Sequence, residues 1–184
     1  MNANNIDHIK KIAIVGGGLM GHGVAQFFAQ GGYPVAMYSR TKESSERAMK
    51  GVEQGLALFV EEGISTQAAA DAALARIRPV TDLAEAVGDA DYITEAVVDD
   101  LALKQKIFKQ MDALAAAHAI LTSETSGLRM TDISRDTTRP ERCITTHNYT
   151  PPPLIPVVEV VPGERTAPEV VETTCALLRK VGKE

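Results

Sequence analysis

The chain has 184 residues, of which 45% are hydrophobic and 23% are charged, an ordinary composition for a globular protein of one domain or slightly more. Its formal net charge of −5 argues against nucleic acid or an anionic membrane surface as a partner. No apolar run reaches the ~18 residues of a membrane span, and the polar N-terminal segment lacks the apolar part of a secretory signal. We therefore expect a cytoplasmic protein whose cysteines, Cys143 and Cys175, are buried reduced thiols and form neither a disulfide nor a metal site.

Near its start the chain has a glycine-rich turn between a predicted strand, residues 12–15, and a predicted helix, residues 20–30. In a G-x-G-x-x-G turn, Gly16 permits the tight bend, Gly18 lets a pyrophosphate approach the backbone, and Gly21 lets the helix pack closely on the strand. Free N–H groups and the positive end of the helix dipole then hold the phosphates. A glycine-rich turn without a ligand is the alternative, but the strand–turn–helix context favours dinucleotide binding. The predicted contacts are Gly16, Gly18, Leu19, Met20 and Gly21.

A second apolar run, residues 34–38, is followed by Ser39-Arg40-Thr41. A dinucleotide site usually has an acidic residue here, about 20 residues past the glycines, which binds the adenine ribose 2′-hydroxyl. A carboxylate repels a 2′-phosphate, whereas a hydroxyl followed by the planar donors of Arg40 accepts one. Ser39 and Arg40 thus favour NADP. The alternative is that Arg40 is a solvated charge or stacks on adenine while NAD binds.

Residues 42–75 are predicted to form a helical hairpin that is longer than a simple crossover needs. Gly63 interrupts it, and Ser65 is the expected cap of the second helix, residues 67–76. The apolar residues of the first helix recur at three- and four-residue spacing, which indicates packing against a core. They are Met49, Val52, Leu56, Phe59 and Val60.

Strands and helices alternate through the middle of the chain. Strands are predicted at residues 77–80, 92–98 and 119–122, and helices at residues 82–87 and 101–117. Asp99 and Asp100 are the expected caps of the longer helix. The predicted apolar face of that helix consists of Leu103, Ile107, Met111 and Leu114. The alternation predicts an α/β fold of the Rossmann type, with a doubly wound, mostly parallel sheet and ligands at the carboxyl ends of its strands.

The second half of the chain contains a candidate general base. His147 follows a predicted strand, residues 143–146, at the end where ligands bind. Glu159 lies in a run of valines, where a carboxylate needs a partner because its desolvation is costly. A histidine oriented by a carboxylate can act as a general base, because the carboxylate stabilises the imidazolium as it forms. Taken singly, a histidine in a loop is more often a polar surface group, and a buried glutamate more often pairs with an arginine.

Several motifs occur in one order along the chain: G-x-G-x-M-G-x-G from Gly16 to Gly23, residues 95–104, Thr125-Ser126, residues 139–142, and the span from His147 to Glu159. In this combination the chain resembles the N-terminal NAD-binding domain of the 3-hydroxyacyl-CoA dehydrogenase family, from about residue 10 to residue 184. The resemblance implies that His147 and Glu159, twelve positions apart, are the catalytic His–Glu pair and that Ser126 hydrogen-bonds the substrate oxygen. It also implies cofactor contacts from Asp99, Lys104 and the position of Glu124, and an arm, residues 42–76, that helps to hold coenzyme A.

The implied reaction is hydride transfer between a nicotinamide cofactor and the hydroxyl-bearing carbon of a 3-hydroxyacyl-CoA or a related hydroxy acid, with His147 taking or returning the hydroxyl proton. Three segments depart from the family pattern. Ser39 replaces the usual Asp, the S-N-T-S turn reads Ser123-Glu-Thr-Ser126, and H-F-F-N-P reads His147-Asn-Tyr-Thr-Pro151. These changes favour a relative that acts on another hydroxy or oxo compound, such as a small hydroxy acid, with acyl-CoA still the largest single expectation.

In the family a further strand and an all-helical dimerisation domain follow, so we expect residues 1–184 to be the NAD(P)-binding domain of a protein that is a homodimer at full length. We expect a small-molecule substrate, with neither nucleic acid nor membrane as a partner. Two other functions compete with the dehydrogenase. One is a non-catalytic or truncated dinucleotide-binding module. The other is an NADP-linked enzyme similar to 6-phosphogluconate dehydrogenase, which leaves the spacing of His147 and Glu159 unexplained.

Overall fold

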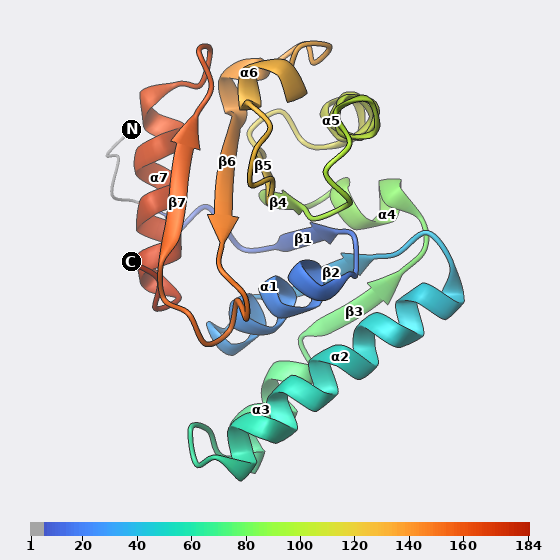
Figure 1. Cartoon of the computed structure of the whole chain (residues 1–184), viewed down its shortest axis with the longest axis vertical. Helices are drawn as coiled ribbons and strands as arrows, with labels where there is room; N and C mark the ends of the chain where they lie inside the picture. The colour runs from blue at the N-terminus through green and yellow to red at the C-terminus, as the bar shows by residue number, and fades with distance from the viewer. Residues whose placement is uncertain (1–5) are drawn as a thin grey trace.

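The computed structural model describes residues 6–184 as a seven-stranded sheet with helices on both faces (Figure 1). The strand order is β3-β2-β1-β4-β5-β6-β7, in which β7 alone runs antiparallel to its neighbour. The strands are β1 (Ile12–Val15), β2 (Val35–Tyr38), β3 (Ile77–Val80), β4 (Tyr92–Glu95), β5 (Ile120–Ser123), β6 (Cys143–Asn148) and β7 (Val158–Pro162). The helices are α1 (Leu19–Gln30), α2 (Lys42–Glu61), α3 (Gln67–Leu74), α4 (Leu83–Val87), α5 (Leu101–Leu114), α6 (Met130–Ile133), α7 (Pro168–Lys180) and the 3-10 turn η1 (Pro140–Arg142). The predicted Rossmann-type, mostly parallel sheet is confirmed.

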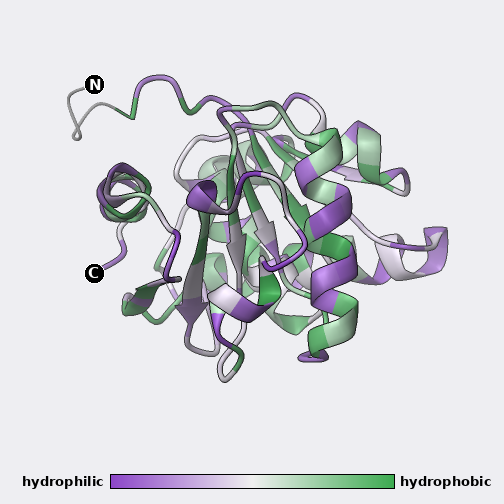
Figure 2. Cartoon of the chain, turned by 90° about the horizontal axis from the view of Figure 1, so that it is seen from above, coloured by the Kyte–Doolittle hydropathy of each residue, from purple (hydrophilic) through white to green (hydrophobic). Residues whose placement is uncertain are grey.

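Two hydrophobic cores lie on opposite faces of the sheet, because alternate residues of a strand point to opposite sides. Ile12 and Ile14 of β1 pack in the core formed with α1, α2, α3 and α7. Ala13 and Val15 pack in the core formed with α4, α5 and α6. Seen from above, hydrophobic positions gather on the strands and on the helix faces beside them (Figure 2). Both faces of the central strands are therefore covered, which explains why they read as uninterrupted apolar runs.

The helical hairpin forms as predicted, and its far end projects beyond the sheet (Figure 1). Thr41 and Ser44 cap the start of α2 reciprocally, side chain to backbone. Val52 and Leu56 of the predicted apolar stripe are buried. The predicted cap of α3 was wrong by one residue, because Thr66, not Ser65, accepts the hydrogen bond from the Ala69 N–H at 3.2 Å.

The predicted apolar face of α5 was only partly right, since Met111 is buried and Ile107 is partly buried. Leu114 is 42% exposed, and the buried side chains of the helix are Lys104, Phe108, Met111 and Asp112. The helix is thus rotated by about one position relative to its most apolar stripe, a turn of about 100°. The rotation places Lys104 inside the protein, where it meets Glu95 of β4.

The order in which strands are added to the sheet reverses between β1 and β4. These two strands are neighbours in the sheet, although two strands and four helices separate them along the chain. At such a switch point the loops after the two strands diverge and leave a crevice at their carboxyl ends. The loops after β1, β2, β4, β5 and β6 all lie at this edge. They contain Gly16, Gly18, Ser39, Arg40, Asp99, Glu124 and Ser126 of the residues that the sequence singled out. β4 ends at Glu95, earlier than predicted, so residues 96–100 belong to the loop at the crevice.

Candidate active site

The glycine turn has the geometry that a dinucleotide requires. Gly16 has φ +114°, and a Cβ there would lie 2.8 Å from the Ala96 carbonyl oxygen. A Cβ on Gly21 would lie 1.7 Å from the Gly16 carbonyl oxygen, so α1 can approach the strand only at a glycine. At Gly18, by contrast, a Cβ would meet nothing within 4 Å. That open space is on the side from which a pyrophosphate would approach. Because Gly18 caps α1 without a side chain, the first N–H groups of the helix are available to an anion.

A cavity of about 720 Å³ extends from this turn along the ends of β2 and β4. Its lining includes the two predicted residues on the β2 side, Ser39 and Arg40, and also Tyr38. Ser39 is only 4% exposed, and its hydroxyl has no hydrogen-bond partner within residues 6–184. A Cβ on Gly17 would lie 2.6 Å from that hydroxyl, so the Ser39 side chain lies beneath the turn, whereas Arg40 is exposed. The Ser39 hydroxyl does not reach the surface in this structure, and its predicted contact with a phosphate stays a prediction.

Two smaller cavities meet at His147 and Ser126, which line both. One, of about 400 Å³, is lined by Met20, Asp99 and Glu124 as well. The other, of about 420 Å³, has Glu159 in its lining. The fold thus brings together the predicted residues of the second half and places them beside the glycine turn through Met20.

His147 and Glu159 face each other across the β6–β7 pair. They are register partners in the antiparallel ladder, and His147 Nδ1 lies 2.8 Å from Glu159 Oε2. This pairing explains the spacing of twelve residues, which is the length of one hairpin between two opposed positions. In neutral imidazole, Nδ1 then carries the proton that Glu159 accepts, and Nε2 is free to accept another.

The environment of this pair differs from the expectation at Glu159, which was predicted to lie inside an apolar strand. β7 is an edge strand, and the Glu159 side chain is 53% exposed, against 22% for His147. Hydrogen bonds from His147 and then from Tyr149 lower the pKa of the Glu159 carboxyl. The same carboxylate raises the pKa of the Tyr149 hydroxyl. The Tyr149 ring lies 5.1 Å from the imidazole, centroid to centroid. Glu159 stays charged because it is hydrogen-bonded and solvated, not because it is buried.

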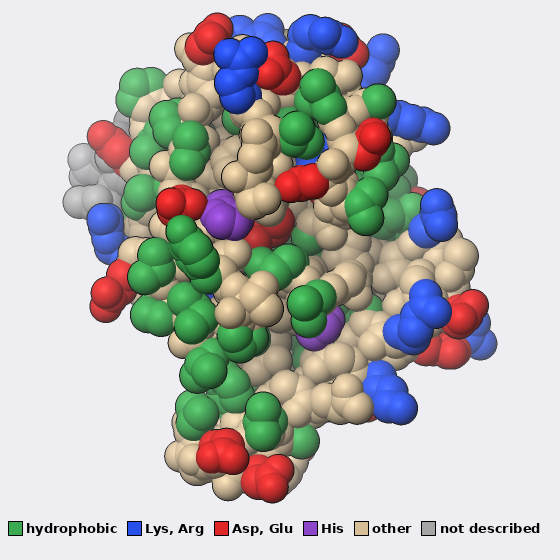
Figure 3. All heavy atoms as spheres, viewed as in Figure 1, with side chains coloured by type: hydrophobic (Ala, Val, Ile, Leu, Met, Phe, Trp, Pro, Cys, Tyr) green, Lys and Arg blue, Asp and Glu red, His purple; other side chains and the backbone are tan. Residues whose placement is uncertain are grey.

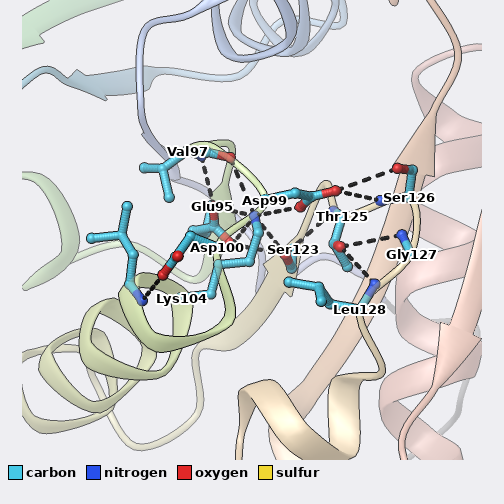
Figure 4. Close-up of polar contacts among 11 residues, drawn as sticks. Glu95, Val97, Asp99, Asp100, Lys104, Ser123, Thr125, Ser126, Gly127 and Leu128 are labelled. Atoms are coloured by element: carbon cyan, nitrogen blue, oxygen red, sulfur yellow. Dashed lines mark hydrogen bonds and ion pairs between the residues drawn. The ribbon is translucent and has the colours of Figure 1, made fainter.

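Ser126 and Asp99 connect the loops after β5 and β4. The Ser126 N–H and hydroxyl each lie 3.3 Å from Asp99 Oδ2, and Asp99 Oδ1 lies 3.3 Å from Lys104 Nζ (Figure 4). Partial burial raises the pKa of Asp99, but hydrogen bonds from Thr125 and Ser126 and the Lys104 charge lower it further, so the net direction is downward. The exposed Ser126 hydroxyl lies at the cavity wall with its single O–H directed at Asp99, so donating to a substrate oxygen requires the hydroxyl to turn away from that carboxylate.

Beneath this wall lies a buried ion pair that sequence reasoning missed (Figure 4). Lys104 Nζ lies 2.7 Å and 2.9 Å from the two carboxylate oxygens of Glu95, and both side chains are fully buried. The Ser123 hydroxyl and the Val97 N–H also donate to Glu95, at 2.7 Å and 2.6 Å. The signal was available, since Glu95 ends an apolar strand and Lys104 follows it on the next helix. The predicted cofactor contact from Lys104 stays a prediction, since here the ammonium group lies behind Asp99 and lines none of the cavities described above.

Glu124 is a second carboxyl with an unusual setting. It accepts hydrogen bonds from Asn148 Nδ2 at 2.8 Å and from the Asn148 N–H at 3.3 Å. Burial raises its pKa to about 8, although the Asn148 bonds oppose the shift. Glu124 and Asn148 are two of the positions at which the chain departs from the family pattern, and the structure shows that they contact each other.

The Rossmann fold, the glycine turn and the cavities at the switch point together define a dinucleotide-binding domain. The family model of the 3-hydroxyacyl-CoA dehydrogenase NAD-binding domain matches residues 11–184, and the chain belongs to that family. The matched model is that of an NAD-binding domain, and the glycine turn fits the pyrophosphate of a nicotinamide dinucleotide.

Individual relatives agree with this assignment. The chain is 36% identical over 175 residues to a probable 3-hydroxybutyryl-CoA dehydrogenase of Bacillus subtilis, covering 95% of this chain and 61% of the relative. It is 35% identical over 171 residues to an L-carnitine dehydrogenase of Bacillus cereus, covering 93% of this chain and 51% of the relative. The crystal structure of 3-hydroxybutyryl-CoA dehydrogenase from Escherichia coli K12 superposes with a TM-score of 0.92 at 34% identity, over 96% of this chain and 37% of that one. The chain thus spans little more than half the length of the curated relatives.

Within residues 6–184 no helix is both long and apolar enough to cross a bilayer. Cys143 and Cys175 are free, as expected, but only Cys143 is buried, and Cys175 is half-buried.

Proposed function

We propose that the chain is the cofactor-binding and proton-transferring domain of an oxidoreductase that interconverts a 3-hydroxyacyl-CoA, or a related hydroxy acid, and the matching ketone. The observation that carries this proposal is the pairing of His147 and Glu159, at 2.8 Å, in a cavity that also contains Ser126. Dinucleotide binding alone needs none of these three side chains. Their meeting beside the glycine turn supports catalysis over a simple binding module.

The geometry supports a role for each residue. His147 Nε2 takes the proton of the substrate hydroxyl, and Glu159 fixes the tautomer and stabilises the imidazolium that results. The Ser126 hydroxyl exchanges its hydrogen bond to Asp99 for one to the same substrate oxygen. In the reverse direction His147 returns the proton to the alkoxide. The nicotinamide ring, when bound, supplies the hydride acceptor or donor.

The substrate class has two candidates. The family name and the hydroxybutyryl-CoA relative support an acyl-CoA. The L-carnitine dehydrogenase relative supports a small hydroxy acid without coenzyme A, as does the polar Glu124–Asn148 pair in the lining of the cavity at His147. In the distal part of the arm, residues 51–75, the charged residues are all acidic, Glu53, Glu61, Glu62 and Asp71, which disfavours a polyanion there.

We further propose a cytoplasmic homodimer as the working form. Support comes from the family resemblance and from hydrophobic side chains that gather over β7 and the loop before it (Figure 3). Those exposed side chains are Tyr149, Leu154, Val157 and Val161. A contiguous apolar patch of this kind is typical of a surface that another domain or protomer covers.

The test compares turnover with cofactor binding. NADH consumption is followed with acetoacetyl-CoA and with 3-dehydrocarnitine, and NADH affinity is measured separately by fluorescence. His147→Gln is expected to lower kcat by about 10²–10⁴-fold, the usual contribution of a general base, without weakening NADH binding. His118→Gln is the matched control, because His118 also lies 2.8 Å from a carboxylate, that of Asp91, but lines none of the cavities described above. Full activity in His147→Gln would refute the proposal.

A further inference from the structure

The cavity at the glycine turn has an unusual charge pattern. Within residues 6–184 its lining includes two guanidinium groups, Arg40 and Arg47, and no carboxylate. The protein as a whole has more acidic than basic residues, 24 against 19. The charged groups that line this cavity of about 720 Å³ are all cationic, so their charge differs from that of the protein as a whole. The charged lining therefore suits an anion.

The two arginines lie at the ribose end of this cavity. Arg40 directly follows β2, where dinucleotide sites hold the adenine ribose, and Arg47 is on α2. The reciprocal hydrogen bonds of Thr41 and Ser44 fix the start of α2 between them. Thr41 and Ser44 are also in the cavity lining, with their hydroxyl groups hydrogen-bonded to each other. Arg47 was not among the residues that the sequence analysis selected.

Neither arginine is committed to a buried partner. Arg47 Nη1 lies 3.0 Å from Glu43 Oε1, but the two side chains are 71% and 80% exposed, and such helix-surface pairs are weak. Arg40 is exposed. Both side chains can therefore turn toward a ligand at little cost.

Ser39 contributes by its size and lack of charge. Its side chain has no charge, so this position lacks the carboxylate that usually binds the adenine ribose 2′-hydroxyl and that would repel a second phosphate. The adenosine 2′-hydroxyl has no carboxylate acceptor in the described lining, whereas a 2′-phosphate finds two planar donors that match its geometry.

We propose that Arg40 and Arg47 bind the 2′-phosphate of NADP(H), so that this domain, in its family of NAD-binding domains, prefers the phosphorylated cofactor. The inference rests on the proposed function only in that both need a nicotinamide dinucleotide in the same crevice. It goes beyond that function by adding Arg47 and a phosphate site.

The experiment is a pair of fluorescence titrations of the protein with NADPH and NADH at fixed ionic strength. Tighter binding of NADPH by tenfold or more, about 1.4 kcal/mol, is expected. Arg40→Ala and Arg47→Ala are each expected to weaken NADPH binding by about tenfold and to leave NADH binding within about twofold. Lys50→Ala is the matched control, an exposed cation of α2 one turn beyond Arg47 that lies outside this lining, and it is expected to change neither affinity.

Adenosine 2′,5′-bisphosphate, which has the second phosphate but no nicotinamide, serves as a further probe and is expected to displace NADPH better than adenosine 5′-monophosphate does. Equal or tighter binding of NADH would overturn the phosphate site and leave the proposed function intact. Arginine variants that lose NADH and NADPH equally would also overturn it. Failure to bind either cofactor would overturn both proposals, and binding without turnover would count against the proposed function alone.

Discussion

The buried ion pair between Glu95 and Lys104 gives the sharpest prediction about stability. Lys104→Met keeps most of the side-chain volume but removes the ammonium group. The Glu95 carboxylate then keeps its hydrogen bonds from Ser123 and Val97 and loses the two from Lys104, in a site with no exposed surface. Breaking a buried pair in this way costs about 3–5 kcal/mol, because a charge is left buried without compensation.

The assay is urea denaturation of wild-type protein, Lys104→Met, and the double variant Lys104→Met with Glu95→Gln. The double variant is expected to recover much of the loss, because an amide is less costly to bury than a lone carboxylate. Lys11→Met is the control, since the Lys11–Asp89 pair is 53% and 64% exposed and surface changes of this kind stay within about 0.5 kcal/mol. A loss below about 1 kcal/mol in Lys104→Met would refute the reasoning, because it would mean that the carboxylate does not depend on its counter-ion.

Three further predictions concern the site. Gly18→Ala is expected to weaken NADH binding and to leave the midpoint of urea denaturation unchanged. Gly21→Ala is expected to lower that midpoint, because a Cβ at Gly21 would lie 1.7 Å from the Gly16 carbonyl oxygen. The opposite ranking of the two midpoints would count against the turn geometry. The pKa of Glu124 is raised to about 8, so its contribution to the free energy of unfolding is complete below the unfolded pKa of 4.5 and is lost as pH rises to about 8. Between these pH values the free energy of unfolding is expected to fall less steeply in Glu124→Gln than in the wild type. An equally steep fall in both would contradict the assignment. Tyr149→Phe removes the second hydrogen bond to Glu159, which is expected to raise the pKa of that carboxyl. The acidic limb of the pH–rate profile is then expected to move to higher pH. A limb that does not move would disprove this prediction.

The sequence predicted the features that depend on local pattern. The glycine turn needs only a few residues at fixed spacing, and the hairpin stripe at Val52 and Leu56 follows from helical periodicity. Alternation of strands and helices was enough to predict a doubly wound sheet. The pairing of His147 with Glu159 was predicted from a family resemblance, and the β6–β7 register supplies its physical basis.

The features that sequence reasoning missed depend on the third dimension. A run of valines does not show that β7 lies at the edge of the sheet, where Val161 and Glu159 face solvent while Val158 is buried. The apolar stripe of α5 does not show that Lys104 turns inward, because that rotation is set by a carboxylate on another element. Arg47 could not be assigned to the cofactor cavity until α2 was placed beside β2.

The central claim is that His147 and Glu159 act as one proton-transferring unit. A double-mutant cycle on kcat, with His147→Gln, Glu159→Gln and the double variant, tests it most directly. Because Glu159 acts through the imidazole, the double variant is expected to lose about as much as His147→Gln alone. If the two losses instead multiply, the residues act independently and the account is contradicted.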